Sequence, residues 1–464
     1  MLNLLSALLH PIPAEKRDLL AARWRSLPAE LRTDRQLVGR QVVHCAYTLG
    51  ASYCSFGCTH CYLPKTANRV PIPSFDEMKA QIDANRRFVG PLGGLQLTGG
   101  DLVDAYWRFG RADELVQIVR YANDAGTVPM LMTHGQVLLE HPDYFVRLVR
   151  DGGLRKIAIH IDITQAGRPG YPIKSLQSER DLSPLRDAFV DLIHDVVRRS
   201  RCRFAAAMTL TVTERNITSV GDVMRWLVAD PRRLQAFRMI SLQPEADVGR
   251  TRFSTEPVTP AHTWAEVGRG LGLTLPNDNL HFGDPACNAM TIVGIDTRTG
   301  DAVDLIPNDE QSRRVWNRML DRFGGVGSWG ERNGEAVLRR LSLLLRDPGL
   351  SVDLVRHVLA RLRAADMWPG AIGSILRGRF RPLTVVMHNF MSEAEANSGS
   401  PEVERRLAAC SFKGAVRREN GWEAVPMCAM NSREREGLYA RAIASASEPS
   451  STPSGKSSAI NTVA

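Results

Sequence analysis

Hydrophobic and polar positions follow two alternating periods between residues 41 and 243. Short segments with a period of two predict strands, and longer segments with a period near 3.6 predict amphipathic helices. The expected strands are Gln41–Thr48, Gly94–Thr98, Val128–His134, Lys156–Ile163, Phe204–Thr213 and Phe237–Gln243. The expected helices are one that starts at the Ser74–Glu77 capping box and those over Asp113–Ala125, Pro142–Asp151, Asp181–Arg199 and Ser219–Ala229. Six successive strand–helix units predict an α/β fold with a parallel sheet or an incomplete barrel.

The pattern changes on both sides of this barrel region, whose expected bounds are 41–250. Residues 1–40 predict an N-terminal helical cap that is broken by prolines. Residues 251–440 predict an α+β C-terminal extension. Its expected elements are a hairpin over Thr291–Ile306, helices over 311–380, a strand over Pro382–Phe390 and a hairpin with its turn at Asn420–Gly421. Residues 441–464 are rich in Ser, Ala and Pro and predict a disordered tail.

Composition narrows the classes of partner. The 464 residues carry a formal charge of +9, mostly from arginines spread along the chain, and no basic block with interleaved aromatics predicts nucleic-acid binding. There are two interpretations of this positive charge. It reflects a bias toward arginine in the composition, or it attracts acidic partners, such as an electron-donor protein or an anionic lipid surface. No apolar run has transmembrane length, and Met1–His10 lacks signal-peptide features, so it predicts a capping helix or a shallow peripheral membrane contact.

Three cysteines within eight residues carry the strongest chemical signal. Cys54, Cys58 and Cys61 have C-x3-C-x2-C spacing and follow the first expected strand. Three thiolates on one loop suit an iron–sulfur cluster with one iron left open to another ligand. Zinc is the alternative, but a structural zinc site needs four ligands, and His60 is poorly placed to be the fourth. A metal signature of this kind indicates a reducing compartment, here the cytoplasm.

This spacing resembles the signature of the radical S-adenosylmethionine (radical SAM) superfamily, Cys-x3-Cys-x-(aromatic)-Cys, with His60 in the aromatic place next to the cofactor. The resemblance implies a partial (βα)6 TIM-type barrel and a 4Fe–4S cluster whose open iron binds S-adenosylmethionine. It also implies a 5′-deoxyadenosyl radical that abstracts hydrogen from substrate, and a flavodoxin- or ferredoxin-type electron donor. Residues 1–40 are too short for a cobalamin-binding domain, so cobalamin is not expected.

The same resemblance assigns a second set of residues to the cofactor. Thr98, Gly99, Gly100 and Asp101 end the second expected strand where the family has a Gly-Gly-Glu-Pro motif at the methionine amino group, although this chain has Asp and Leu in place of Glu and Pro. An ordinary turn is the alternative. The other candidates are polar residues expected on later strands, namely Asp162, Thr211 and Ser241. Asp162 shares a strand face with His160, so a hydrogen-bond network that only fills the barrel is an equal alternative.

Three further cysteines lie far apart in the expected extension. Cys287, Cys410 and Cys428 each border a predicted hairpin or turn, so they predict an auxiliary iron–sulfur site or, alternatively, three unrelated core thiols. The stretch that ends in Pro426–Asn431 is similar to the C-terminal segment of the tetraether-lipid synthase and archaeal methylase-like group. That resemblance implies a lipid substrate. The alternatives are a peptide- or small-metabolite-modifying radical SAM enzyme, or a non-catalytic iron–sulfur redox protein.

Overall fold

A computed structural model describes residues 8–41, 45–251, 258–275, 280–324 and 333–447. Within these residues the chain forms one mixed sheet of eleven strands in the order β11-β10-β1-β2-β3-β4-β5-β6-β9-β7-β8. The strands are β1 Cys45–Tyr47, β2 Gly94–Leu97, β3 Val128–Thr133, β4 Lys156–His160, β5 Ala205–Val212, β6 Phe237–Pro244, β7 Asn288–Asp296, β8 Ala302–Asp304, β9 Phe380–His388, β10 Lys413–Arg418 and β11 Gly421–Pro426.

The centre of the sheet is the parallel run from β1 to β6, in which each strand pairs with the next along the chain. Helices connect these strands, as the alternating pattern predicted: α3 Phe75–Val89, α4 Leu102–Arg108, α5 Ala112–Asp124, α6 Gln136–Glu140, α7 Pro142–Arg150, α8 Ser183–Ser200, α9 Val220–Val228 and α10 Pro231–Ala236. The capping box of Ser74 and Glu77 is present at the start of α3. The first strand is shorter than the expected Gln41–Thr48, of which residues 42–44 lie outside the described residues.

The C-terminal region extends this sheet at both edges. Strand β9 pairs with β6 and strand β10 pairs with β1, both in parallel, so segments about 30 residues apart in the sequence lie at opposite ends of the parallel run. The sheet is open, because β11 and β8 are its two outer strands. The fold is therefore α/β with a large, mostly parallel open sheet. Strands from before and after the expected domain boundary at residue 250 therefore pair with one another in a single sheet.

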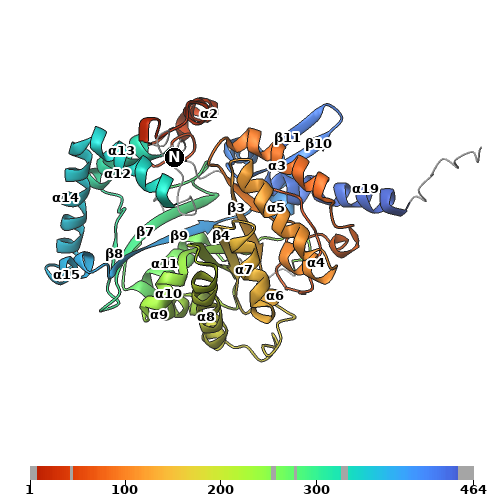
Figure 1. The fold of residues 1–464 in the computed structure, drawn as a ribbon, viewed down its shortest axis with the longest axis horizontal. Coiled ribbons are helices and arrows are strands. Elements are labelled where there is room, and N and C mark those ends of the chain that lie inside the picture. The colour runs from red at the N-terminus through yellow and green to blue at the C-terminus, as the bar shows by residue number, and fades with distance from the viewer. Residues whose placement is uncertain (1–7, 42–44, 252–257, 276–279, 325–332, 448–464) are drawn as a thin grey trace, which may run out of the picture.

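Helices also contact both outer strands: helix α14, Pro348–Ala364, contacts β8, and helix α3 contacts β11. Figure 1 shows α12–α15 as a lobe beyond β7 and β8, and the β10–β11 hairpin at the opposite edge. The remaining helices are α2 Ala14–Ser26, α11 Pro260–Leu271, α12 Glu310–Phe323, α13 Asn333–Arg346, α14 Pro348–Ala364, α15 Gly370–Leu376, α16 Glu393–Ala396, α17 Pro401–Ala409, α18 Met427–Ala429 and α19 Arg435–Ser447. None of the helices in the described part of the chain has both the length and the apolar character to span a bilayer.

The expected tail differs from the structure at its beginning. Residues 441–447 belong to α19 rather than to a disordered segment, because Ala-rich sequence has high helix propensity and continues the preceding turn. Residues 448–464 lie outside the described residues. Most of the hydrophobic core packs between the parallel strands and helices α3–α11, which fixes the loops at the carboxyl ends of the strands on a rigid base.

Candidate functional site

A cavity of about 610 Å³ extends through the region enclosed by the strands. Most of the predicted site residues line it: Cys54, Cys58, His60, Cys61, Thr98, Gly100, Asp101, Thr211 and Ser241. Four predicted site residues, Gly99, Asp162, Cys287 and Cys410, are not part of its lining. The C-terminal region contributes His388, Phe390, Met427, Cys428 and Asn431 to the same wall. Segments far apart in the sequence therefore share one cavity, as in ligand sites at the carboxyl ends of parallel strands.

The cysteine loop has no regular secondary structure, and backbone bonds hold it. Gly57 N donates to Ala166 O at 2.8 Å and Thr59 N donates to Thr164 O at 3.2 Å, so the loop pairs with the segment that follows β4. At the other end of the loop, Arg250 donates through Nη2 to Cys61 Sγ at 3.2 Å. These bonds place three sulfur ligands before any metal binds, which favours binding by lowering its ordering cost.

The environment of the cysteines fits a multi-iron cluster. Burial, together with the nearby Cys61 and Asp162, raises the pKa of Cys58 to about 12, and burial also raises the pKa of Cys54. At neutral pH these thiols stay protonated unless a cation is close by. A metal ion supplies that positive charge when it binds, and the thiols then lose their protons. Among the described residues, three metal-ligating atoms come within 4.8 Å of one another only in Cys54, Asp104 and His134. The three cysteines are therefore spread more widely than ligands of a single ion, as expected around separate irons of a cluster.

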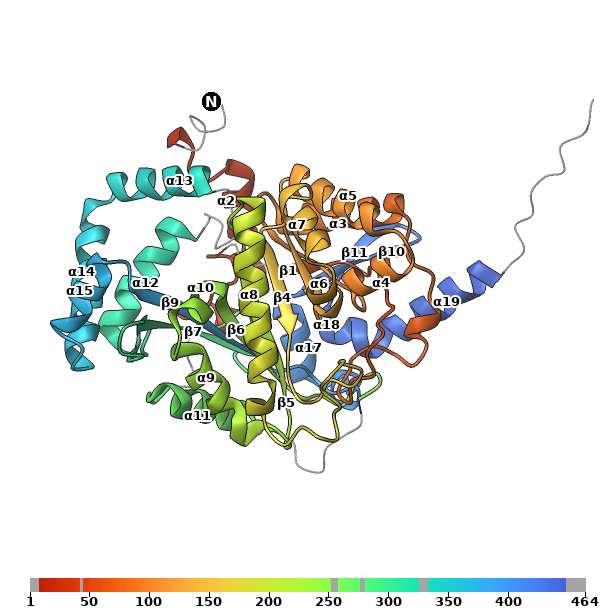
Figure 2. The same cartoon turned by 60° about the horizontal axis from the view of Figure 1, so that its bottom comes forward.

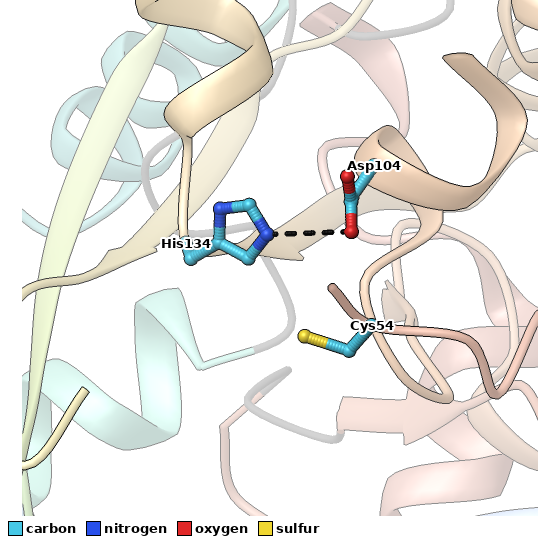
Figure 3. Close-up of side chains that lie close together, drawn as sticks. All are labelled: Cys54, Asp104 and His134. Atoms are coloured by element: carbon cyan, nitrogen blue, oxygen red, sulfur yellow. Dashed lines mark ion pairs between the residues drawn. The ribbon is translucent and has the colours of Figure 1, made fainter. Parts of the chain in front are cut away.

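The group of Cys54, Asp104 and His134 in Figure 3 is better described as a hydrogen-bonded support than as a metal site. His134 Nδ1 accepts from Gln136 N at 3.1 Å, so its proton is on Nε2. That atom lies 3.3 Å from Asp101 Oδ2 and 3.6 Å from Asp104 Oδ2. Asp104 is ionised: burial opposes this, but the nearby His134 and the hydrogen bonds from Arg108 and the Ser55 amide hold its pKa below the usual range.

The structure gives a packing reason for the two glycines. A Cβ on Gly99 would lie 2.7 Å from Gly50 O, and one on Gly100 would lie 2.5 Å from Ser52 O. Both positions therefore require glycine because the chain leading into the cysteine loop passes directly over them. The sequence predicted either a close approach to a ligand or an ordinary turn, whereas the close approach here is to the protein's own backbone.

Asp101 is buried and its carboxylate is shared among protein donors. It caps α4 by accepting from Asp104 N at 3.0 Å, and it accepts from Thr133 Oγ1 at 2.8 Å and from His134 N at 2.7 Å. These bonds join the second and third strands beside the cysteine loop. Asp101 also lines the cavity, so its structural role and contact with a ligand are compatible.

Asp162 belongs to the network that the sequence offered as an alternative. Its oxygens accept from Thr164 N at 2.8 Å and from Thr211 N at 2.8 Å, and His160 Nε2 lies 2.6 Å from Oδ2. Burial acts against ionisation, but pairing with His160 and these bonds lower the pKa of Asp162 to about 2. With both oxygens occupied and no exposure to the cavity, Asp162 fixes the ends of β4 and β5.

Sequence reasoning missed a buried ion pair in the cavity wall. His60 Nε2 lies 2.6 Å from Glu245 Oε2, and the Glu245 side chain is only 2% exposed. The available signal was the alternation of Ser241, Gln243 and Glu245, which continues the polar face of β6 past its end. This pair puts a carboxylate next to His60, which lies within the cysteine motif.

The buried oxygens in the cavity wall that are without a hydrogen-bond partner among the described atoms include Thr209 Oγ1 and Asn431 Oδ1. Thr209 is on β5, and Asn431 is in a π-helical turn, Met430–Glu434, between α18 and α19. Buried polar groups are normally satisfied, and π-turns are frequent at functional sites. Both observations favour a polar ligand in this cavity.

The three C-terminal cysteines come together in a second, smaller pocket of about 30 Å³. Cys287, Cys410 and Cys428 line it with His388 and Arg406, and Cys428 also lines the large cavity. Arg406 donates through Nε to Cys287 Sγ at 3.4 Å. Burial lowers the pKa of His388 to about 4, so its imidazole is neutral at physiological pH. Neutral imidazole and thiolate are both metal ligands.

No family model and no curated protein match this sequence. Among solved structures, anSMEcpe with bound AdoMet is similar with a TM-score of 0.33 and 12% identity, over 49% of this chain and 58% of that chain. The same protein with AdoMet and Cp18Cys peptide gives 0.33 and 11%, over 48% and 56%. A xylose isomerase-like TIM barrel protein from Mycobacterium smegmatis with magnesium gives 0.30 and 14%, over 68% and 99%. Similarity this low defines no function, which rests instead on the residues of the site.

Proposed function

We propose that this protein is a radical SAM enzyme. The observation that carries the proposal is the position of Cys54, Cys58 and Cys61. Their family-like spacing falls on a loop after β1, and all three line one end of a large cavity at the carboxyl ends of parallel strands. A cluster holder without catalysis would not need a cavity of about 610 Å³ next to its cysteines.

In this proposal the three cysteines hold a 4Fe–4S cluster. When bound, the cluster supplies the electron that cleaves S-adenosylmethionine and so starts radical chemistry on the substrate. Arg250 donates a hydrogen bond to the Cys61 sulfur, which partly neutralises the charge of the thiolate. His134 and Asp104 support the Cys54 side of the loop, and Phe56 stacks on the His134 ring at 3.8 Å between centroids. The protein thus positions the cluster and shields it from water.

S-adenosylmethionine would take the polar part of the same cavity. Thr98, Gly100 and Asp101 line it beside the cysteines, and Thr211 and Ser241 line it from the neighbouring strands. The methionine ammonium suits carboxylates such as Asp101, and ribose hydroxyls suit hydroxyl and amide oxygens such as Thr209 Oγ1. Gly99 packs against the backbone of Gly50 and Ala51, just before the cysteine loop. Glu245 orients the His60 ring.

We also propose an auxiliary iron–sulfur site at Cys287, Cys410 and Cys428. Three half-buried thiols from three separate segments line one pocket, and this convergence favours a shared ligand over unrelated core cysteines. Because Cys428 faces both pockets, a metal centre there would lie at the wall of the large cavity. It could pass electrons to the reaction or anchor a substrate atom.

The substrate that fits best has a long apolar part. Methionine and other apolar side chains cover much of the cavity: Met130, Met132, Ala158, Met239, Met290 and Ile292. This lining supports a lipid, modified at an unactivated carbon by coupling, methylation or a similar reaction, more than a charged metabolite or a peptide. The electron donor would be a flavodoxin- or ferredoxin-type protein, for which the basic surface is suited.

Spectroscopy of the reduced protein tests the proposal. We expect anaerobically reconstituted protein, reduced with dithionite, to show an electron paramagnetic resonance signal that changes when S-adenosylmethionine is added. The triple variant Cys54→Ala, Cys58→Ala, Cys61→Ala should lose this response, and Cys202→Ala, which changes a cysteine outside both pockets, should keep it. A signal indifferent to S-adenosylmethionine would favour the second candidate, a non-catalytic iron–sulfur redox protein.

A further inference from the structure

Arg435 carries a buried positive charge that forms no ion pair with a carboxylate of the described residues. The residue begins α19 and is only 1% exposed. Its Nε and Nη1 atoms have no hydrogen-bond partner among the described atoms. The adjacent Glu434 is paired with Arg418 instead, at 2.7 Å. Guanidinium groups stay protonated, and an uncompensated charge in a protein interior is strongly unfavourable, so the position of Arg435 requires a negative group nearby.

Helix α19 packs against the cysteine loop. The Arg435 guanidinium lies 4.9 Å from the centroid of the Tyr62 ring, and Tyr62 directly follows Cys61. About one turn further along α19, Tyr439 packs in a cluster with Cys54 and Cys61. Figure 2 shows α19 beside the segment that connects β1 to α3, which contains this loop. The face of an aromatic ring attracts a cation, but a neutral tyrosine does not supply a full negative charge.

The negative group that fits is the cysteine loop when it carries its cluster. The cysteine ligands of a cluster are thiolates, and three of them outweigh the positive charge of a 4Fe–4S core, so the loaded loop is an anion. Arg250 already bonds to Cys61 Sγ, but Arg250 is only half-buried. Arg435 is shielded from water, and buried charges are screened much less than exposed ones. Its charge should therefore act on the loop over the distance that Tyr62 spans.

We propose that Arg435 is a positioning residue that supplies the buried counter-charge for the cluster at Cys54, Cys58 and Cys61. Reduction adds one more negative charge to the cluster, which the guanidinium favours, so Arg435 raises the reduction potential. The interaction is reciprocal, so the bound cluster also stabilises the packing of α19 on the loop. This inference rests on the proposed function only for the presence of a reducible cluster on these cysteines.

Potentiometric titration of the full chain, reconstituted anaerobically, tests the counter-charge. Arg435→Met keeps much of the apolar volume and removes the charge. We expect its cluster to be about tenfold harder to reduce, which is about 59 mV for a one-electron couple. Arg435→Lys keeps the charge and should recover most of the shift. The matched control is Arg433→Met in the turn before α19, because Arg433 is paired with Glu404 at 2.9 Å, and its potential should equal that of the wild type.

Hydrogen exchange of the α19 amides gives a second measurement that needs no variant. In the wild type we expect residues 435–447 to exchange several-fold more slowly in the reconstituted protein than in the metal-free protein. Arg435→Met should lose most of this dependence on the cluster. A side chain that only fills space would not make the exchange depend on the cluster. If Arg435→Met misfolds, the comparison within the wild type still decides.

Three results would overturn the proposal: an unchanged potential in Arg435→Met with full iron content, an equal shift in Arg433→Met, or exchange of α19 that does not depend on the cluster. A shift confined to a cluster at Cys287, Cys410 and Cys428 would also overturn it and assign the charge of Arg435 to that group. A cluster that is reducible but indifferent to S-adenosylmethionine would contradict the proposed function and leave the potential and exchange results as they are. The two failures are therefore distinguishable.

Discussion

The two cysteine groups are assembled in different ways. Cys54, Cys58 and Cys61 lie on one loop of eight residues, and their spacing alone predicts a shared ligand. Cys287, Cys410 and Cys428 come from the start of β7, the end of α17 and helix α18, and only the open sheet brings them to one pocket. The first group is local in the sequence, and the second is a product of the fold.

This difference has a physical consequence. A local loop can be preorganised by a few backbone bonds, such as those from Gly57 and Thr59, so its ligands keep their places if distant elements move. The second group depends on β9, α17 and the β10–β11 hairpin packing together, so its geometry should respond to changes in any of them. The geometry of the first cysteine group should therefore be insensitive to changes elsewhere in the protein. The geometry of the second group should depend on the rest of the fold.

The largest expected effect comes from Gly100→Ala. The added Cβ meets the backbone of Ser52 and Tyr53 just before Cys54, where nothing flexible can give way. We expect a destabilisation of about 3 kcal/mol near the loop and loss of the iron bound there. The measurement is iron and sulfide per chain after anaerobic reconstitution. The matched control is Gly57→Ala inside the motif, whose Cβ would meet no atom within 4 Å. Equal iron in both variants would contradict the packing account.

A second test separates the two groups. The double variant Cys410→Ala, Cys428→Ala should lose about half of the bound iron and keep the signal that responds to S-adenosylmethionine. The triple variant of the first group should show the reverse. Iron and sulfide analysis with Mössbauer spectroscopy measures both. If the triple variant retains its fold and binds no iron, the C-terminal thiols are core residues and the proposed auxiliary site is wrong.

A third test addresses the base beneath the first group. Asp162→Asn should lower the free energy of unfolding of the metal-free protein by about 3 kcal/mol at neutral pH, because buried donors lose a charged acceptor. The folded-state pKa of Asp162 is about 2, below its unfolded value, so the stabilisation is present above about pH 4 and is lost as the pH falls toward 2. Urea unfolding at several pH values should show the difference from wild type shrinking in acid. A constant difference would contradict the ionised state.

The smallest expected effect concerns the tuning of the first group. Arg250→Leu removes the hydrogen bond to Cys61 Sγ, and hydrogen bonds to cluster sulfurs raise the reduction potential. A bond of about 1 kcal/mol corresponds to a decrease of about 40 mV for a one-electron couple. Potentiometric titration measures the shift, and Arg250→Lys should recover part of it. An unchanged potential with full iron content would mean that the bond does not reach the bound cluster.

Much of the parallel sheet could be predicted, because the alternating apolar patterns of β2 to β6 report burial directly. The hairpin of β10 and β11 was also predicted, although its turn lies at Glu419–Asn420, one residue before the expected Asn420–Gly421, and Gly421 is the first residue of β11. The pairing of β9 with β6 and of β10 with β1 could not be predicted from one sequence. Those pairs join segments more than 130 residues apart, and only the competition among all edges of the sheet selects them.

The residues of the candidate site also fall into those predictable from local sequence patterns and those that depend on contacts between distant segments. The cysteine motif, Gly100 and Thr211 were found from local patterns and placed in the cavity by the structure. Asp162 was predicted either as a ligand contact or as part of a hydrogen-bond network, and the structure shows its bonds to Thr164 and to Thr211 of the neighbouring strand. The pairing of His60 with Glu245 was missed for a similar reason. The two residues are far apart in the sequence, and neither local pattern indicates that they are in contact.

The most direct test of the central claim is the fate of S-adenosylmethionine. Reconstituted protein is incubated anaerobically with dithionite and S-adenosylmethionine, and 5′-deoxyadenosine is measured by liquid chromatography and mass spectrometry. Our account predicts that the wild type forms it and that the Cys54→Ala, Cys58→Ala, Cys61→Ala variant does not, while Cys202→Ala forms it at the wild-type rate. No 5′-deoxyadenosine from wild-type protein that carries a full, reducible cluster on these cysteines would contradict the account.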